Sequence, residues 1–372
     1  MSSTWGNQIQ ISIFGGSHTE AIGVNIDGLP AGERIDWEQV LAQMARRAPG
    51  QDPTATRRKE SDTPQVVCGM SEDYILTGAP LCALIYNGNQ RSKDYGNLRD
   101  TPRPGHADYT AQVKYRGFQD IRGGGHFSGR LTAPLVFAGA VCRQILERRG
   151  IVIGAHVSSI GAAEDDRFDP VDPSADLLRK LNREYFPVIS TGAKDAMRAV
   201  VEAARMEADS VGGTIECAVL GMPVGAGNPM FGGVENLISS IVFGIPAVKG
   251  IEFGAGFSSA LLRGSENNDT PYYEGRTVRT RTNRAGGILG GISNGMPVVF
   301  RVAVKPTSSI GREQDTVNLQ TGKNDKLVVH GRHDPCIVPR AVPVVEAAAA
   351  VVCLELLAQS GMLAAEGLKE RG

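Results

Sequence analysis

The C-terminal part of the chain contains the apolar run Ala341-Val-Pro-Val-Val-Glu-Ala-Ala-Ala-Ala-Val-Val-Cys-Leu-Glu-Leu-Leu-Ala358. Two carboxylates interrupt this run, Glu346 and Glu355, so it predicts a helix buried in a protein core rather than one that crosses a bilayer. Pro343 suits the first turn of such a helix, and Gly361 suits its end. We therefore expect a core built around a helix that ends at about Gln359.

Amphipathic and alternating patterns precede this run. Asp36 and Gln39 form a capping-box pattern, which predicts a helix that ends before Pro49-Gly50. Apolar periodicity predicts further helices over 131–149, 194–209 and 237–243. Alternation predicts strands over 8–14, 66–69, 81–86, 151–160, 213–220 and 297–305. Since there is no fixed-period repeat and no Gly/Ser-rich or Pro-rich linker, we expect one α+β domain over residues 1–372.

The composition excludes several classes of protein. Glycine supplies 46 of the 372 residues, about an eighth, where roughly 7% is usual. The glycines cluster instead of recurring at every third position, which excludes collagen. Hydrophobic residues make up 41% and the formal net charge is −1, which excludes a disordered chain. The isoelectric point of about 6.6 argues against a chain-wide basic surface for nucleic acid.

The cysteines and the N-terminus bear on metal binding and location. The six cysteines lie far apart and form no C-x-x-C pair, which does not fit a structural zinc site. Several stand in apolar runs, as buried free thiols do. Residues 1–10 lack the basic and apolar regions of a signal peptide. We expect no metal, no membrane span and a reducing, cytoplasmic location.

Glycine clusters and arginines share the loops. The clusters at 15–16, 123–125 and 290–291 are each followed within two residues by polar side chains, and none fits a dinucleotide or P-loop fingerprint. They indicate either plain turns or close backbone approach to a flat or anionic ligand. Arginines beside these loops, such as Arg103 and Arg130, suit bidentate contacts to phosphate or carboxylate, whereas isolated ones are simply solvated. A substrate with several negative charges would explain their number.

Two histidines are candidates for acid–base work. His18 and His106 stand where loops meet regular elements, and the unperturbed histidine pKa of about 6.5 suits proton transfer. No metal-binding spacing such as H-E-x-x-H occurs. Asp334, close to Arg332, fits either a turn or a carboxylate held in a pocket. The segment 305–309 ends a strand with a lysine and hydroxyls, which are either solvated or donors to a phosphate or polar ring.

Taken in order, these motifs resemble those of the chorismate synthase family. Any one of them is weak, but eight or more in family order make a chance match very improbable. The matching stretches are Phe14-Gly-Gly-Ser-His-Thr19, Arg46-Arg-Ala-Pro-Gly50, Asn89-Gln-Arg-Ser-Lys-Asp-Tyr95, Arg103-Pro-Gly-His-Ala-Asp-Tyr-Thr110, Arg122-Gly-Gly-Gly125, Ala247-Val-Lys-Gly250, Ala285-Gly-Gly-Ile-Leu-Gly-Gly-Ile-Ser293, Lys305-Pro-Thr-Ser-Ser-Ile310 and Gly331-Arg-His-Asp-Pro-Cys336.

The resemblance implies a reaction, a cofactor and a fold. The family is a carbon–oxygen lyase acting on phosphates: it converts 5-enolpyruvylshikimate 3-phosphate to chorismate by a 1,4-anti elimination, the last common step of the shikimate pathway. The reaction requires reduced FMN, which is reduced at the expense of NADPH and lends an electron transiently. The implied fold is a single-domain β-α-β sandwich, two antiparallel sheets with helices packed between them. The implied assembly is a homotetramer.

The resemblance also implies residue roles. His18 would protonate the departing phosphate, His106 would stabilise or protonate the reduced flavin, and Asp334 would assist removal of the ring proton near the flavin N5. Arg47, Arg130 and Arg340 match arginines near substrate or NADP phosphates. The implied flavin site consists of His126, Phe127, Ser128, Ala247, Gly290, Lys305, Pro306, Thr307, Ser308, Ser309 and Arg332.

The sequence departs from the commoner family pattern in places. His126 replaces an arginine, so its flavin contact is expected to be weaker or pH-dependent; Pro53, Pro246 and Arg284 also replace commoner residues. Two rival functions remain open at this stage. One is a non-catalytic binding protein for a phosphorylated ligand or RNA, and the other is a flavin reductase with net hydride transfer. Because no extra reductase domain is visible, we expect a separate reductase to supply the flavin.

Overall fold

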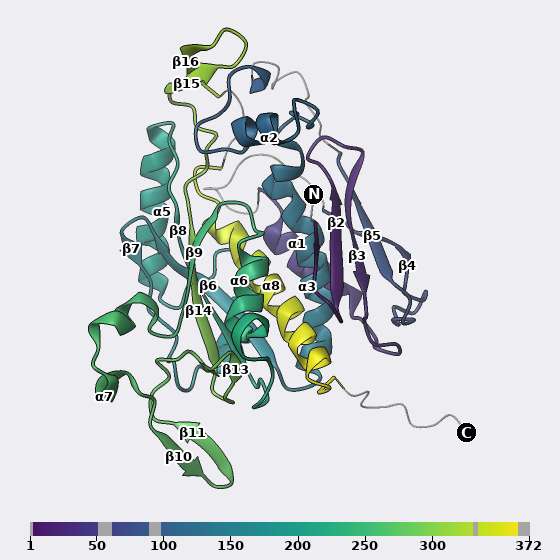
Figure 1. Cartoon of the computed structure of the whole chain (residues 1–372), viewed down its shortest axis with the longest axis vertical. Helices are drawn as coiled ribbons and strands as arrows, with labels where there is room; N and C mark the ends of the chain where they lie inside the picture. Colours follow the sequence, from purple (N-terminus) through teal and green to yellow (C-terminus); the bar gives the residue numbers. More distant parts are fainter. Residues whose placement is uncertain (1–2, 51–61, 89–97, 330–333, 364–372) are drawn as a thin grey trace.

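Two five-stranded antiparallel sheets form the framework of the computed structural model, which describes residues 3–50, 62–88, 98–329 and 334–363. The first sheet comes from the N-terminal part of the chain (Figure 1). Its strand order is β1 (Thr4–Trp5), β2 (Gln10–Gly15), β3 (Ala21–Asp27), β5 (Leu81–Tyr86) and β4 (Gln65–Cys68). The second sheet has the order β7 (Ala163–Glu164), β6 (Val152–Ile160), β8 (Gly213–Leu220), β14 (Val298–Val304) and β9 (Val248–Phe253).

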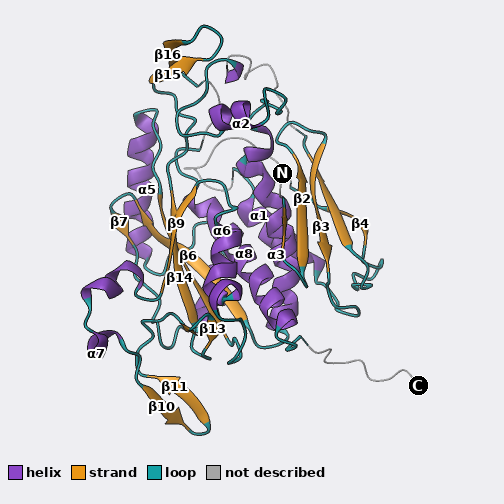
Figure 2. Ribbon diagram, in the orientation of Figure 1, coloured by secondary structure: helices purple, strands orange, loops and turns teal. Residues whose placement is uncertain are grey.

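Helices lie between the two sheets (Figure 2). Helix α3 (Thr132–Glu147) packs on β2, β3 and β5, and α8 (Val338–Gln359) packs on β6 and β8. The two helices also pack on each other, and a Cβ at Gly139 would stand only 2.2 Å from the Cβ of Ala347. The small side chains on these helices therefore let them approach closely, and the α+β class predicted from the sequence is confirmed.

Helix α8 matches the apolar run, with one correction. It begins at Val338 instead of near Pro343, so Pro343 lies inside the helix and Pro339 occupies its first turn. A proline inside a helix lacks the N–H that bonds the preceding turn; here the dense apolar packing around the helix outweighs that loss. By length and composition α8 is apolar enough to span a membrane, yet 94% of its most apolar window is buried inside the protein, as in a core helix.

The other predicted elements are found with small changes of boundary. Asp36 caps α1 (Trp37–Arg47) by accepting from the backbone N–H groups of Glu38 and Gln39. Helices α5 (Thr191–Met206) and α6 (Val234–Val242) begin three residues before their predicted starts. The sequence did not predict α2 (Asp108–Lys114), α4 (Ala175–Leu181), α7 (Gly264–Asn267), β1, β3, β7, β9, and the short hairpins β10 (Pro271–Glu274) with β11 (Thr277–Thr280), β12 (Ile288–Leu289) with β13 (Ile292–Ser293), and β15 (Gln314–Asn318) with β16 (Lys323–Leu327).

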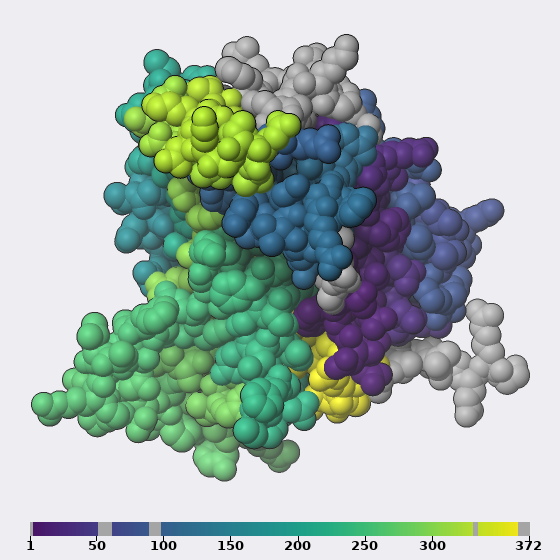
Figure 3. Space-filling view, turned by 45° about the horizontal axis from the view of Figure 1, so that its top comes forward, coloured from purple at the N-terminus to yellow at the C-terminus, as the bar shows by residue number. Residues whose placement is uncertain are grey.

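Loops gather at one end of the framework. Figure 3 shows the segment around α2, drawn in blue, between the β15–β16 hairpin and the N-terminal strands. Leu319 donates its backbone N–H to Asp100 O, and Thr316 Oγ1 donates to Pro102 O, so the hairpin is tied to the segment that precedes α2. Segments from three distant parts of the sequence meet at this end of the molecule, and they bring together the candidate residues described next.

Candidate active site

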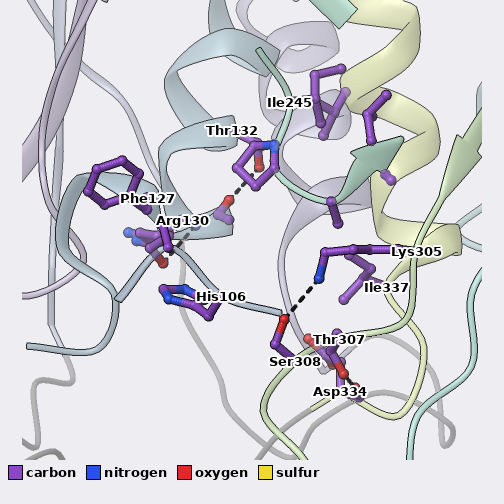
Figure 4. A pocket seen from close by; sticks show the side chains of 18 of the residues that line it. His106, Phe127, Arg130, Thr132, Ile245, Lys305, Thr307, Ser308, Asp334 and Ile337 are labelled. Carbon is purple, nitrogen blue, oxygen red and sulfur yellow. Dashed lines mark hydrogen bonds between the residues drawn. The ribbon is translucent and has the colours of Figure 1, made fainter. Parts of the chain in front are cut away.

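A cavity of about 630 Å³ opens at this end of the molecule, between the end of α1, the start of α3, the loop before β9 and the loop after β14. Its volume lies in the roughly 300–1,000 Å³ range of small-molecule sites. Backbone and side chains from residues 103–107, 123–132, 243–249, 305–309 and 334–344 contribute to its wall, and Figure 4 shows part of it.

Most of the site residues predicted from the sequence line this one cavity. They are Arg47, His106, His126, Phe127, Ser128, Arg130, Ala247, Lys305, Thr307, Ser308, Ser309, Asp334 and Arg340. Pro306 lies in the same loop without reaching the wall, and Arg332 lies outside the described residues. The structure does not bring Gly290 to the cavity, because Gly290 is exposed in the turn between β12 and β13, at the opposite end of the molecule in Figure 1.

His106 belongs to a hydrogen-bonded cluster at the start of α2. Its Nδ1 lies 2.6 Å from Asp108 Oδ1 and 3.1 Å from Arg103 Nη2. Arg103 is buried and donates to both carboxylate oxygens of Asp108, from Nε at 2.7 Å and from Nη2 at 2.8 Å. Burial alone would raise the pKa of Asp108, but the hydrogen bonds from Arg103 and His106 outweigh it and hold that pKa well below its usual value. Asp108 is therefore a carboxylate that only accepts.

His18 lies behind the cavity wall. It is buried, and its Nδ1 is 3.0 Å from Ser17 Oγ, whose single hydrogen is donated to Arg122 O at 3.1 Å. Ser17 Oγ therefore accepts from Nδ1–H of His18. Gly123, which lines the cavity, covers the His18 ring so closely that no side chain would fit at that position. A Cβ at the next residue, Gly124, would stand 3.4 Å from His106 Cε1 and Nε2. The glycine turn thus separates the two histidines.

Two arginines of the cavity share one buried carboxylate. Asp62 forms ion pairs with both Arg47 and Arg130 and is itself almost inaccessible to solvent. Burial lowers the pKa of Arg47 to about 10, while Asp62 opposes that shift. For Asp62, burial favours the neutral acid, but Arg47 and Arg130 outweigh it and lower its pKa. Arg130 Nε also donates to Asn87 Oδ1 at 2.9 Å, so its guanidinium is held in one orientation.

Arg340 joins the arginine pair to Asp334. Its Nη1 forms an ion pair with Asp334, and its Nε donates to the backbone carbonyl of Arg47 at 3.1 Å. Thr307 Oγ1 donates to the backbone carbonyl of Asp334 at 3.0 Å. The predicted carboxylate therefore lies in a pocket and not in a solvated turn, although its pocket partner is Arg340 and the predicted Arg332 is not described.

The loop after β14 presents an amine and hydroxyls to the cavity. Lys305 Nζ donates to Ser308 Oγ at 2.8 Å, and Ser308 Oγ donates to Gly105 O at 2.7 Å (Figure 4). Burial, followed by the nearby charge of Lys249, lowers the pKa of Lys305. The backbone N–H of Lys305 bonds Ala247 O at 2.9 Å, and Ala247 has φ +74, a conformation that L-residues rarely adopt and that is often found at functional sites.

The residues that depart from the family pattern do not all lie at the cavity. Both ring nitrogens of His126 are engaged by the protein: Nδ1 bonds Gly15 O at 2.8 Å and Nε2 bonds Ser3 Oγ at 2.7 Å. His126 thus ties the loop to β2 and to the N-terminus. It also lines the cavity, and the weaker or pH-dependent flavin contact expected of it stays a prediction. Pro246 lines the cavity, Arg284 is half-buried away from it, and Pro53 lies outside the described residues.

Sequence reasoning missed two carboxylates of the site. Asp108 had a local signal, because it follows His106 by two residues and begins a helix. Asp62 had none, since its partners Arg47 and Arg130 lie 15 and 68 residues away along the chain. Within the described segments, no group of three or more His, Cys, Asp or Glu side chains is arranged to hold a metal ion.

The chain is similar over nearly its full length to a known family. The family model described as chorismate synthase matches residues 9–358. Curated proteins named chorismate synthase are similar to it: one from Lancefieldella parvula is 47% identical over 367 residues, covering 96% of each chain. One from Methanocaldococcus jannaschii is 41% identical over 372 residues, covering 98% of each.

The fold also matches a solved structure. A chain titled "Crystal Structure of Chorismate Synthase" superimposes with a TM-score of 0.74, covering 95% of this chain and 93% of that one. The sequence identity of that pair is 24%, so the match bears on the fold alone.

Proposed function

The chain belongs to the chorismate synthase family, and from that membership we propose that its cavity is where the family's reaction takes place. The activity is that of a lyase of the shikimate pathway, in aromatic amino-acid biosynthesis: phosphate is eliminated from 5-enolpyruvylshikimate 3-phosphate to give chorismate, with a reduced flavin required. The alternative of a non-catalytic binding protein for a phosphorylated ligand or RNA is not favoured by these relatives.

One observation carries the assignment of the cavity: four arginines and two lysines line it together with His106. The substrate has a phosphate and two carboxylates, and planar guanidinium groups bind such anions in bidentate fashion. Arg47 and Arg130 are oriented by buried ion pairs with Asp62, and Arg340 by a partly buried ion pair with Asp334. Oriented donors in a partly desolvated cavity favour anion binding without reorganisation.

The residues of the cavity fit a flavin mononucleotide. Gly123 lines the cavity, and a Cβ there would collide with the His18 ring, so only backbone meets a bound ring at this point. Lys305, Thr307, Ser308 and Ser309 would hold the phosphate or the polar edge of the ring. When bound in reduced form, FMN supplies an electron that it recovers within the same turnover, so the reaction involves no net oxidation.

The two histidines and Asp334 are assigned the proton-transfer roles. His106 faces the cavity and stabilises or protonates the reduced flavin at Nε2, since its Nδ1 is bonded to Asp108. His18, buried next to the cavity-lining Gly123, protonates the departing phosphate. Asp334 assists removal of the ring proton, with Arg340 holding its carboxylate. General acid–base groups of this kind contribute roughly 10²–10⁴-fold each.

Further proposals concern the fold and the assembly. One cluster of buried side chains runs through both sheets and the helices between them, which supports a single-domain β-α-β sandwich. Large apolar side chains are exposed on segments 230–289, among them Met230, Phe231, Phe257, Leu261 and Tyr273. Exposed apolar surface of this extent supports a subunit interface and hence a homotetramer. We also place the enzyme in the cytoplasm.

The source of reduced flavin is open to a direct test. We propose that a separate reductase supplies FMN reduced at the expense of NADPH. Purified protein with oxidised FMN, NADPH and substrate should form no chorismate, whereas the same mixture with an added flavin reductase should. Turnover with NADPH alone would contradict external supply. Retention of full activity in His106→Ala with reduced FMN would contradict the catalytic assignment.

A further inference from the structure

The contacts of Asp108 point to a role that the proposed function does not assign. Asp108 is the first residue of α2 and lies beside the cavity residue His106 without lining the cavity. Its Oδ2 accepts from the backbone N and the Nε of Arg103, at 3.0 Å and 2.7 Å. Its Oδ1 accepts from Arg103 Nη2 at 2.8 Å and faces His106 Nδ1 at 2.6 Å.

We propose that Asp108 is the positioning residue of His106, holding the imidazole as the Nδ1–H tautomer so that Nε2 is presented to the cavity. The inference rests on the proposed function, in which His106 acts at Nε2. An ionised carboxylate can only accept hydrogen bonds, and at 2.6 Å Asp108 Oδ1 is the nearer partner of Nδ1, so this nitrogen carries the hydrogen. Arg103 Nη2, which lies 3.1 Å from the same nitrogen, then donates to Asp108 Oδ1 at 2.8 Å. Fixing the tautomer of a histidine through a carboxylate on its other nitrogen is a general device of acid–base sites.

Arg103 holds the carboxylate of Asp108 in one orientation. It contacts both oxygens of Asp108 through a fork of donors, a geometry that fixes the rotation of the carboxylate. Its remaining terminal nitrogen, Nη1, donates to Ser309 Oγ at 3.1 Å, in the loop proposed to hold the flavin. The backbone N–H of His106 bonds Arg103 O at 3.3 Å. The ring, the carboxylate and the flavin loop are therefore joined through one buried side chain.

The opposite edge of the ring faces a glycine. Gly124 has φ +123, and a Cβ there would stand 3.4 Å from His106 Cε1 and Nε2. Glycine at this position therefore leaves the space next to Nε2 free of a side chain. With Nδ1 bonded to Asp108, Nε2 is the ring nitrogen left for a bound molecule.

A purely structural role for Asp108 makes a different prediction. As an acidic residue in the first turn of α2, it also stabilises that helix end. If this were its whole contribution, replacing it would lower stability and would act independently of His106. If it acts through His106, its replacement should matter only while the imidazole is present. A double-mutant cycle separates the two roles.

The experiment compares Asp108→Asn, His106→Ala and the double variant, assayed anaerobically with reduced FMN and 5-enolpyruvylshikimate 3-phosphate. The amide can turn its NH₂ toward His106 and so favour the other tautomer. We expect kcat of Asp108→Asn to fall by about 10²-fold, while KM and the Kd for FMN change by less than about 3-fold. The double variant should be no slower than His106→Ala alone.

A matched control is Asp165→Asn. Asp165 pairs with His156 at 2.9 Å, a second buried His–Asp pair that lies away from the cavity. This variant should lower thermal stability and leave kcat unchanged. Additive losses in the double variant, or a kcat of Asp108→Asn within about 3-fold of the parent, would overturn the role of Asp108. Full activity of His106→Ala would instead overturn the catalytic role proposed for His106, and absence of product from the parent protein would overturn the proposed function.

The tautomer can be measured without any replacement of Asp108. In protein labelled with ¹⁵N-histidine, the His106 signals are those that His106→Ala lacks. We expect chemical shifts of a protonated Nδ1 and an unprotonated Nε2 at a pH where the ring is neutral. A protonated Nε2 with an unprotonated Nδ1 would refute the proposal even if Asp108→Asn failed to fold.

Discussion

Gly123 lies directly against the imidazole of His18: a Cβ at Gly123 would stand 2.2 Å from Cε1 and 2.4 Å from Nδ1 of that ring. Gly123 also lines the cavity, with φ +65, so its backbone couples the position of the His18 ring to the cavity wall. Contacts this short do not occur in folded proteins. Any side chain at this position must therefore displace either the ring or the turn.

The first prediction follows from this contact. Gly123→Ala should lower kcat by about 10²-fold, because displacement of His18 removes one acid–base group. Steady-state assays with reduced FMN measure the effect. Gly275→Ala is the matched control, since Gly275 has φ +63 and nothing within 4 Å of its Cβ position, so it carries the same backbone strain without the collision. Equal effects of the two substitutions would assign the loss to strain alone.

The second prediction concerns the carboxylate shared by two arginines. Asp62→Asn leaves Arg47 and Arg130 without their buried counter-charge, which should lower the free energy of unfolding by about 3–5 kcal/mol. Inorganic phosphate should then raise the melting temperature more in the variant than in the parent protein, since an anion replaces the carboxylate. Asp176→Asn, which breaks the exposed pair with Arg179, should change neither quantity.

The same carboxylate has a pH signature. The folded-state pKa of Asp62 is lowered below its ordinary 3.8, so its contribution to stability is present above about pH 4 and is lost as the pH falls through the lower folded value. Acid unfolding of Asp62→Asn should accordingly be less steep than that of the parent. Superimposable acid-unfolding curves, apart from a constant offset, would contradict this assignment.

The third prediction concerns Lys305. Lys305→Met should weaken binding of FMN by roughly 10- to 100-fold, because hydrogen bonds to charged groups contribute about 1.5–3 kcal/mol. Burial and the charge of Lys249 lower the pKa of Lys305. As the pH rises, Lys305 should therefore lose its proton at a lower pH than an ordinary lysine, and flavin affinity should decline there. Flavin fluorescence titration measures both. Lys180→Met, on the exposed side of α4, should leave the affinity unchanged.

The fourth prediction concerns a buried network far from the cavity. His156 bonds Asp165 at 2.9 Å and Glu216 at 3.1 Å. Burial lowers its pKa, but the two carboxylates outweigh burial and raise it above 6.5. Its contribution to stability is then fully present below pH 6.5 and is lost as the pH rises through the folded-state pKa.

His156→Gln should therefore cost about 3–5 kcal/mol of unfolding free energy at pH 6, and less at higher pH. Urea unfolding at a series of pH values gives the difference, with Lys180→Met again as the control. A penalty that does not change with pH would contradict a charged His156. The network also corrects one expectation, because Asp165 begins a segment that was predicted to be exposed and is itself buried against His156.

Local signals explain what the sequence predicted well. The cap at Asp36, the apolar run of α8 and the alternation of β14 depend on neighbours a few residues apart, and all three were found. Contacts between distant segments had no such signal. His126 bonds Gly15 O and Ser3 Oγ, 111 and 123 residues away, and nothing in its own motif indicates those partners.

The glycines of the site show the same difference between local signals and contacts of distant segments. The sequence connects the glycine excess with loops that hold charged residues, but it could not tell which glycines approach the histidines. Gly123 and Gly124 do so just before the short 3₁₀ helix Gly125–Phe127, with φ +65 and +123. Gly290 shares the composition of those loops and yet lies in an exposed hairpin at the other end of the molecule.

The central claim is that the protein eliminates phosphate from its substrate in this cavity and that the reduced flavin is not oxidised overall. The most direct measurement supplies the protein anaerobically with reduced FMN and 5-enolpyruvylshikimate 3-phosphate and follows chorismate, phosphate and flavin absorbance together. We predict equal amounts of chorismate and phosphate, many turnovers per flavin, and a flavin that is still reduced at the end. Absence of product, or one flavin oxidised for each product formed, would contradict the account.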